Sequence, residues 1–565
     1  MNYLLVIVSA ALIAYVVYTL YIRLQLSLAK HPSLRGHSKW SRRLAKHIPY
    51  FEYTFKKLFE CDGAPRLIAR ARRDSFEKLA KTLRDRSPTT VQQSNSLADS
   101  ISDMKFTNAY RVPFPFRKAI EGHFPVTNLV IESNNSSVKD LDNNWMLDLS
   151  GSYGVNLFGY DFYKECMQQG LAKIQQLGPV LGQYHPIILE NVKQLKKISG
   201  LEEVSFHMSG TEAVMQAVRL ARYHTGRTHL VRFCGAYHGW WDGVQPGIGN
   251  QRKTEDVYTL SDMSEQTLKV LAQRKDIACV LINPLQALSP NSDASGDASL
   301  VNSSRHAKFE KRAYIQWLQK LQKVCRENQI VIILDEVFTG FRLAYRGAAE
   351  YFNIQPDIIT YGKTLGGGLP VGVVCGKSEL MMRYKTQQPA NVSFARGTFN
   401  SHPMVMACMQ EFLTRIKAPE FQQLYANAEQ LWDARFAGLN QSLEQQGVSI
   451  RIENLLSVCT VIYTTPSRFN WMFQFYLRKQ NLLLSWVGSG RFIFNHSFTD
   501  EEFDQVSQAI IKAAIEMKQA GWWWANEKLT NKTINRQMLK AMVKAKFPLF
   551  ADHEQEGEQS ILMEK

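Results

Sequence analysis

The stretch IVIILDEVFTGFR, residues 330–342, places an acidic pair directly after five apolar residues. A short apolar run of this kind is typical of a strand that is buried on both faces of a sheet. Asp335 would therefore lie at the carboxyl end of a buried strand, where sites form in open α/β sheets. A carboxylate in so apolar a setting requires a partner, and a protonated pyridine nitrogen would be one.

Four further apolar runs accompany this stretch: HLVRF (229–233), ACVLINP (278–284), DIITYGK (357–363) and VGVVCGK (371–377). Polar, helix-compatible segments precede the runs at 229, 278 and 330. This alternation predicts an α/β fold with a mostly parallel sheet that is covered on both faces. After about Ser401 a long helical pattern leads into a smaller α+β segment that ends near Gly521.

The run DIITYGKTLGGGLPVG (357–372) places Lys363 at the end of another predicted strand. A lysine in such a position, where the local polarity is low, can form a Schiff base with a carbonyl. The three glycines at 366–368 allow the backbone to approach a ligand closely. Taken alone, a surface lysine ahead of a glycine-rich turn is the alternative.

Two more motifs lie upstream. Within FHMSGTEAVMQAVRLARYHTGR (206–227), Ser209-Gly210-Thr211 lies just before a predicted helix, and backbone N–H groups at a helix N-terminus can bind an anion such as phosphate. A simple N-cap is the alternative for this motif. In CGAYHGWWDG (234–243), Tyr237 and His238 lie between glycines at a strand end, where they could stack on a planar ring or merely pack as buried aromatics.

In their order and spacing, SGTEAVMQAVRLAR, AYHGWWDG, LDEVFTGFR and YGKTLGGGLPVG resemble the class III aminotransferases and the glutamate-1-semialdehyde aminomutases, over roughly residues 106–515. The resemblance extends to GTFNSHP (397–403) and to DLSGSYGVNLFGY (148–160). It implies a pyridoxal 5′-phosphate (PLP) enzyme with the fold type I of PLP-dependent transferases. It also implies an obligate homodimer with active sites at the subunit interface.

The resemblance, joined to the residue chemistry, implies a role for each motif. Lys363 would be the Schiff-base lysine and then the general acid/base, and Asp335 would keep the pyridine nitrogen protonated. Tyr237 would stack on the ring with His238 beside it, and Val337 would pack against the other face. The cofactor phosphate would be held by Ser209, Gly210, Thr211 and Thr398 of the partner subunit.

Tyr153 and Arg491 are candidates on the substrate side of this site. Arg491 could bind the carboxylate of an amino donor, and an ordinary surface arginine is the alternative. The eight cysteines are scattered without a C-x-x-C pair, which argues against a zinc site and fits a reducing compartment. No metal site is expected.

Residues 4–22 read LLVIVSAALIAYVVYTLYI and carry no charge. Because about 20 apolar residues span a hydrocarbon core of roughly 30 Å, residues 1–22 are predicted to be a single transmembrane anchor. A signal peptide and a buried helix are the alternatives, but no basic residue precedes the run and no small-x-small site follows it. The basic flank after Arg23 places the catalytic domain in the cytoplasm by the positive-inside rule.

The formal net charge is +16, and residues 23–86 hold 17 Lys and Arg against six Asp and Glu. This excess favours a segment near anionic lipid over a solvated helical spacer, and no recognition module accompanies it that would indicate nucleic-acid binding. Residues 23–105 are thus predicted to be a basic juxtamembrane helical segment whose end, 87–104, is a polar linker. The large PLP-binding domain with its N-terminal segment would span 106–400, the small domain 401–520, and a basic tail rich in tryptophan 521–565.

The chain departs from the family pattern at Asn283-Pro284-Leu285-Gln286, where Glu-Pro is usual, which leaves the role of this position open. Residues 335–363 also resemble the aminotransferase domains of lipopeptide and polyketide assembly lines. Together with the anchor, this suggests an aminotransferase that moves an amino group from an amino-acid donor to an aldehyde or keto group of a hydrophobic or acyl-chain compound. A 2,1-aminomutase of the glutamate-1-semialdehyde type is the alternative. Loss of Lys363 or Asp335 would have indicated a non-catalytic scaffold, and both are present.

Overall fold

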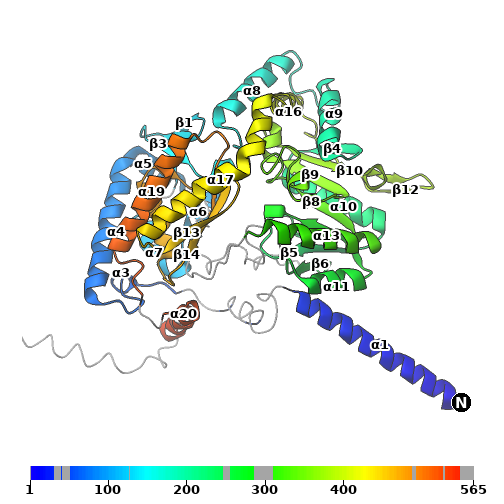
Figure 1. Ribbon diagram of the computed structural model, residues 1–565, viewed down its shortest axis with the longest axis horizontal. Coiled ribbons are helices and arrows are strands. Elements are labelled where there is room, and N and C mark those ends of the chain that lie inside the picture. The colour runs from blue at the N-terminus through cyan, green and yellow to red at the C-terminus, as the bar shows by residue number, and fades with distance from the viewer. Residues whose placement is uncertain are drawn as a thin grey trace, which may run out of the picture.

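The computed structural model of the chain describes residues 2–30, 51–98, 100–125, 127–245, 255–285, 309–485, 491–525 and 529–546, together with Trp40 and His47. Two lobes form the body, and helix α1 (Asn2–Ala29) projects from the larger lobe (Figure 1). All five apolar runs form buried strands: β5 (His229–Phe233), β7 (Ile277–Ile282), β8 (Val331–Asp335), β9 (Ile358–Gly362) and β10 (Gly372–Gly376).

These strands join β4 (Glu203–His207) and β6 (Val257–Leu260) in a seven-stranded sheet of order β4-β10-β9-β8-β7-β5-β6. Strands β9, β8, β7, β5 and β6 run parallel to one another, and β10 runs antiparallel to both of its neighbours, β4 and β9. The prediction of a mostly parallel sheet is therefore confirmed. The carboxyl ends of the parallel strands meet at one edge of the sheet, where a site can form.

Helices cover both faces of this sheet. Successive residues of a strand point to opposite faces, so alternate side chains pack against different helices. In β8, Val331 and Ile333 pack with the apolar face of α10 (Gly210–Thr225). Ile332 and Leu334 belong instead to the core shared with α11 (Glu265–Gln273) and α13 (Lys311–Glu327). Because these strands are buried on both faces, their sequences are nearly continuous apolar runs.

The large lobe also contains α8 (Tyr160–Ile174), α9 (Ile187–Ser199), α14 (Ala348–Tyr351), α15 (Ser378–Met381), α16 (Pro403–Arg415), the 3-10 turns η3 (Gly151–Gly154) and η5 (Lys363–Gly366), and the hairpin of β11 (Tyr384–Lys385) and β12 (Gln388–Val392). The long helix α17 (Pro419–Gln445) leads from it into the small lobe (Figure 1).

The small lobe has two sheets. One contains β13 (Ile450–Leu455), β14 (Val458–Tyr463) and β16 (Arg491–Ile493), and the other has the order β1-β2-β3-β15, with β1 (Val130–Asn134), β2 (Ser137–Asp140), β3 (Trp145–Asp148) and β15 (Leu482–Leu483). Its helical elements after α17 are η6 (Asn470–Met472), α18 (Phe473–Lys479) and α19 (Asp500–Gln519). The N-terminal elements α3 (Phe55–Leu58), α4 (Arg66–Arg86), η2 (Phe114–Phe116) and α7 (Arg117–Glu121) lie beside them.

The prediction of a polar linker over residues 87–104 is wrong. This stretch forms α5 (Pro88–Ala98) and the start of α6 (Ser102–Ala109). The carboxylate of Asp142 accepts hydrogen bonds from the backbone N–H groups of Thr89 and Thr90, at 2.8 and 2.9 Å, and so caps the first turn of α5. The polar composition of residues 87–104 is typical of a linker. Asp142, which is distant in sequence, caps the first turn and so allows these residues to form a helix.

The tail predicted to begin at residue 521 also needs correction at its start. Trp522 and Trp523 are buried in the core of the small lobe, where Trp522 packs against Phe59 and Phe469. The indole N–H of Trp522 donates to the hydroxyl of Tyr476 at 2.8 Å. The described part of the remaining tail forms α20 (Asn531–Lys546).

Helix α1 continues past the predicted end of the anchor at residue 22. Residues 5–29 are long and apolar enough to cross a bilayer, by length and composition alone. The last turn docks on the large lobe, because the carbonyl of Ala29 accepts from the N–H of Ser261 at 2.9 Å and Ala29 is fully buried. The amide of Gln266, in α11, donates to Gln25.

The basic segment before residue 87 contains a buried ion pair, and the arginine of this pair also bonds to the small lobe. The guanidinium of Arg72 donates two bonds to the Asp62 carboxylate, at 2.9 and 2.8 Å, and its Nε donates to the carbonyl of Gly521 at 2.9 Å. Both side chains are almost fully buried, and Arg72 lies over the ring of Phe469 at 4.5 Å. Part of the basic excess is therefore structural.

We expect Arg72→Met to lower the free energy of unfolding by about 3–5 kcal/mol, because it leaves the Asp62 carboxylate buried without its partner. Urea unfolding followed by tryptophan fluorescence measures this change. Arg70→Met is the matched control, since Arg70 is exposed and its contact with Asp74 is a surface pair. Equal unfolding midpoints for both variants would contradict the structural role of Arg72.

Candidate active site

A cavity of about 530 Å³ opens at the edge of the sheet where the parallel strands end. Ten of the eleven residues that the sequence nominated line it: Tyr153, Ser209, Gly210, Thr211, Tyr237, His238, Asp335, Val337, Lys363 and Arg491. They come from segments up to 338 positions apart, which the sheet brings to one place. Thr398, expected to act in a neighbouring subunit, does not line it and is exposed.

Asp335 ends β8 as a buried carboxylate, 3% exposed. Nδ1 of His238 donates to its Oδ2 at 2.7 Å. The backbone N–H of Val337 and the hydroxyl of Thr360 donate to its Oδ1, at 3.1 and 3.3 Å. Three donors from separate segments thus satisfy and orient the carboxylate at the floor of the cavity.

Lys363 directly follows β9 and takes a left-handed backbone conformation, with φ 47°. Such a conformation is strained for a residue with a side chain, and strain of this kind concentrates at functional sites. Burial lowers the pKa of Lys363, Asp335 partly offsets this, and Arg342 adds to the lowering. A larger fraction of the amine is therefore neutral and nucleophilic than in an ordinary lysine.

Space for Lys363 depends on Gly154, in η3. The φ of Gly154 is 96°, and a Cβ there would lie 2.6 Å from the ring of Phe338 and 3.3 Å from Cδ of Lys363. Only glycine combines this backbone angle with such close packing. Phe338 in turn lies beneath the ammonium, 5.8 Å from ring centre to Nζ.

The predicted anion site is the N-terminus of α10. Ser209 is its N-cap, and its hydroxyl accepts from the N–H of Glu212, so this side chain has the capping role that the sequence left open. A Cβ on Gly210 would lie 2.5 Å from Val337, which means that glycine lets the helix start directly against the end of β8. The first turn of α10 with Thr211 faces the cavity.

Tyr237 lies on the cavity wall and remains 60% exposed. Burial of its remaining part raises the pKa of Tyr237, and the nearby Asp335 raises it further. The side-chain amide of Asn283 donates to the carbonyl of Tyr237 at 2.9 Å, while its oxygen accepts from the N–H of Leu285. Asn283, which stands where the family usually has glutamate, therefore holds the loop that carries Tyr237. Gln286 lies outside the described residues.

Sequence reasoning missed the hydrogen bond from His238 to Asp335, and it missed Thr360 and Phe338. Thr360 is a hydroxyl inside the buried strand β9, and such an isolated polar residue in an apolar run is a signal that could have found it. The pairing of His238 with Asp335 spans 97 positions and leaves no local signal.

The arrangement fits PLP. The N-terminus of α10 offers backbone donors for a phosphate, Asp335 offers a charged partner for a protonated ring nitrogen, and Lys363 offers an amine for the aldehyde. In addition, Nε2 of His238 is buried without a hydrogen-bond partner. An orphaned polar atom beside a cavity is explained by a ligand that the protein binds there.

Comparison with known proteins agrees with this chemistry. The family model for aminotransferase class III matches residues 120–514. The glutamate-1-semialdehyde 2,1-aminomutase of Methanocaldococcus jannaschii is 28% identical over 381 residues, which cover 64% of this chain and 80% of that protein. The enzyme of the same name from Hydrogenobaculum sp. is 30% identical over 346 residues, or 58% of this chain and 75% of that protein.

Solved structures share the fold. A β-phenylalanine aminotransferase from Variovorax paradoxus superposes with a TM-score of 0.62 at 22% identity, over 78% of this chain and 96% of that one. A glutamate-1-semialdehyde aminomutase from Pseudomonas aeruginosa PAO1 gives 0.63 at 17% identity, over 79% and 99%. The predicted family, fold type and cofactor are thereby confirmed. The chain belongs to the class III aminotransferases, the PLP-dependent transaminases of this fold.

Proposed function

We propose that this transaminase moves an amino group from an amino-acid donor to an aldehyde or keto group on a hydrophobic or acyl-chain acceptor. The observation that carries the proposal is the large apolar share of the residues that line the cavity. The apolar residues are Val155, Met208, Val214, Leu285, Val337, Phe338, Leu369, Pro370, Val371 and Ile493. Such a lining favours acceptors that bury methylene groups.

The residues around the proposed cofactor site have distinct roles. Lys363 would hold the cofactor through its Nζ and, once displaced by the substrate amine, the same Nζ would take up the proton that the amine-bearing substrate carbon loses. Asp335, oriented by His238, would keep the ring nitrogen protonated, and Val337 would pack against the ring. When bound, PLP supplies the electron-withdrawing ring that labilises the substrate C–H bond.

The N-terminus of α10, with Gly210 and Thr211, would hold the phosphate end of the cofactor. Two copies of the chain form the active unit, in which Thr398 of the partner subunit completes the phosphate site. Exposed apolar residues near Thr398 support this arrangement, since Phe394 is 65% and Phe399 53% exposed. Association of two copies would bury these rings.

A 2,1-aminomutase is the second candidate, because several relatives with 28–31% identity carry that name. Both reactions use the same cofactor residues. A transaminase transfers the amine to a second molecule, whereas an aminomutase moves it within one molecule. An assay with an amino donor labelled with ¹⁵N separates them, because only a transaminase delivers the label to a different carbon skeleton.

Helix α1 anchors the protein in a membrane as a single span, with the catalytic lobes on the cytoplasmic side. The apolar side chains of the helix from Leu5 to Tyr21 are exposed, which supports a lipid environment over a buried helix. No disulfide joins any of the eight cysteines, all of which the structure describes, and this supports a reducing compartment.

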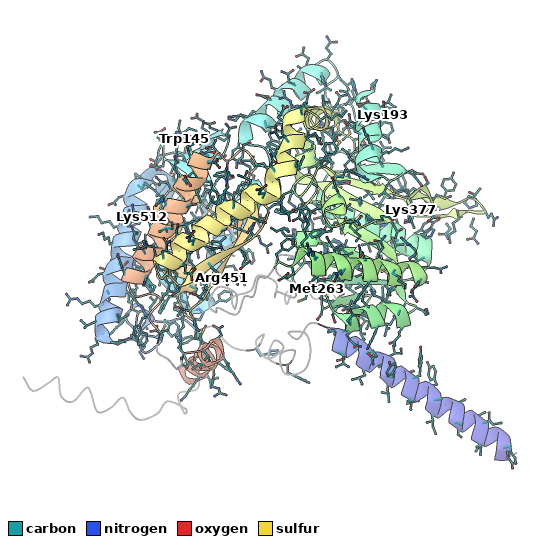
Figure 2. All side chains as sticks on the ribbon, viewed as in Figure 1. Trp145, Lys193, Met263, Lys377, Arg451 and Lys512 are labelled. Carbon is teal, nitrogen blue, oxygen red and sulfur yellow. The ribbon has the colours of Figure 1, made fainter. Side chains whose placement is uncertain are left out.

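We expect Lys363→Ala to abolish the visible absorbance band of lysine-bound PLP and to lower kcat by about 10²–10⁴-fold, because the variant lacks both the covalent link and the proton carrier. Absorbance spectra and turnover with a panel of amino donors measure both effects. Lys193→Ala is the matched control, since Lys193 is exposed on α9 (Figure 2) and does not line the cavity. An unchanged spectrum in Lys363→Ala would refute the assignment of the lysine.

For the acceptor, we expect kcat/KM to rise about fourfold with each methylene from butanal to octanal, since burial of a CH₂ contributes about 0.8 kcal/mol. Amine transfer from one fixed donor, measured across this series, tests the expectation. Pyruvate serves as the short, polar comparison. Turnover of pyruvate without turnover of any long-chain aldehyde would contradict the hydrophobic acceptor.

The proposed membrane span of α1 can be tested separately. Leu12→Arg combined with Val16→Arg should release the protein from the membrane fraction, because each arginine costs about 2.5–3.5 kcal/mol near the centre of a spanning helix. Carbonate extraction followed by immunoblotting measures the release, with Leu12→Phe and Val16→Leu as the apolar control. Recovery of a mature chain without the helix would instead indicate a cleaved signal peptide.

A further inference from the structure

Helix α20, near the C-terminus, is attached to the small lobe by one of its faces. Ile534 is fully buried, and Nη2 of Arg468 donates to Oε1 of Gln537 at 2.6 Å. Arg468 is itself only 3% exposed, and its Nη1 donates to the hydroxyl of Tyr53 at 2.9 Å. These contacts hold the first half of the helix and settle which of its faces turns toward the protein.

The opposite face of α20 is exposed to solvent. Its residues follow the spacing i, i+4, i+7, i+8 and i+11, which places side chains on one side of a helix. We call this set the outer face of α20; it consists of Lys532, Arg536, Leu539, Lys540 and Val543. Leu539 is 49% and Val543 39% exposed. Two branched apolar side chains therefore stand among three cations, on a surface that the described part of the chain leaves uncovered.

The charge on the outer face is not used inside the protein. Helix α20 contains five Lys and Arg and no Asp or Glu. Within the residues that the structure describes, no carboxylate forms an ion pair with Lys532, Arg536 or Lys540. Arg72 in the N-terminal segment differs, since its guanidinium is paired with Asp62. The charge of the outer face is therefore available to a partner outside the described chain.

An anionic lipid surface matches this combination of side chains. Lipid phosphates and carboxylates attract lysine and arginine, and each cation close to such a surface strengthens binding about fivefold. The boundary between head groups and acyl chains also accepts apolar side chains, so Leu539 and Val543 would gain by leaving water. The proposed span of α1 would already hold the chain at a bilayer, which raises the local concentration of lipid for a second contact.

We propose that the outer face of α20 lies on the anionic surface of the membrane that α1 spans. Figure 1 shows α20 below the small lobe and α1 descending from the large lobe, so both leave the body on the lower side of this view. A span alone lets the catalytic lobes turn and tilt on the bilayer, whereas a second contact from the other lobe restricts them. The inference goes beyond the proposed function and uses the span only to bring α20 close to lipid.

Vesicle binding is the first test, with full-length holoenzyme in which Leu12→Arg and Val16→Arg disable the span. This protein should sediment with phosphatidylcholine vesicles that contain about one third phosphatidylserine, and bind phosphatidylcholine alone at least about tenfold less. Lys540→Glu should weaken binding at least about fivefold, because it removes an attraction and adds a repulsion. Leu539→Ala should weaken it about threefold to tenfold through the lost apolar contact.

Matched controls carry the same substitutions on other helices. Lys512→Glu, on α19 (Figure 2), changes an exposed lysine in the same way, and Leu431→Ala, on α17, removes a leucine that is 41% exposed. Both should bind vesicles as strongly as the parent protein. If Lys540→Glu and Lys512→Glu bind equally, or if phosphatidylserine makes no difference, the proposal fails.

Protection from trypsin tests the same contact in the wild-type chain. Trypsin cleaves after lysine and arginine, and Lys532, Arg536 and Lys540 are exposed. In bilayers that contain phosphatidylserine, cleavage at these sites should be at least about fivefold slower than in phosphatidylcholine alone. Cleavage after Lys385, in the exposed hairpin of β11 and β12, is the internal control and should not change. Equal cleavage rates at α20 in the two bilayers would overturn the proposal.

Two other occupants of the outer face would give different results. If a second copy of the chain covers it, Leu539→Ala changes the oligomeric state measured by light scattering without lipid and leaves vesicle binding unchanged. If the acidic end of the chain covers it, vesicles bind only after Glu554→Gln, Glu556→Gln and Glu558→Gln remove that charge. Either result overturns the proposal.

Discussion

A carboxylate buried at the end of β8 is the constraint on which the large lobe depends. Asp335 needs hydrogen-bond donors because water is excluded, and it obtains them from the loop after β5, from its own turn and from β9. Asp335 pairs with Thr360 in the sheet register, so a slip of β9 by one residue would remove a donor and turn a hydroxyl into the core. The sheet is thus built around a charge as much as around its apolar residues.

Much of this arrangement could be predicted from the sequence, because the deciding signals are local. Apolar runs mark the strands, and the chemistry-bearing residues directly follow them, as Lys363 follows β9. The features that could not be predicted are hydrogen bonds between residues that are far apart in the sequence. The bond from His238 to Asp335 is one case, and the capping of α5 by Asp142 is another, since a polar stretch becomes a helix only when a remote carboxylate receives its first N–H groups.

The basic N-terminal segment shows how charge can mislead when it is read from composition. Arg72 pairs with Asp62, Arg84 donates to the carbonyl of His123, and Arg86 donates to the end of α18. These guanidiniums join the segment to the small lobe, where long side chains with several donors can satisfy carbonyls that a helix end leaves unpaired. The charge available to a lipid surface is correspondingly smaller than the sequence suggests.

The docking of α1 has a consequence for the outer edge of the large sheet. β6 is the last strand of that sheet, and Lys30 forms a β-bridge with Leu260 on its free side, beside the bond from Ser261 to Ala29. An uncovered edge strand offers unpaired N–H and C=O groups to any other extended chain. The chain's own N-terminal segment occupies part of these groups, which protects the sheet from growing by edge-to-edge aggregation at that end.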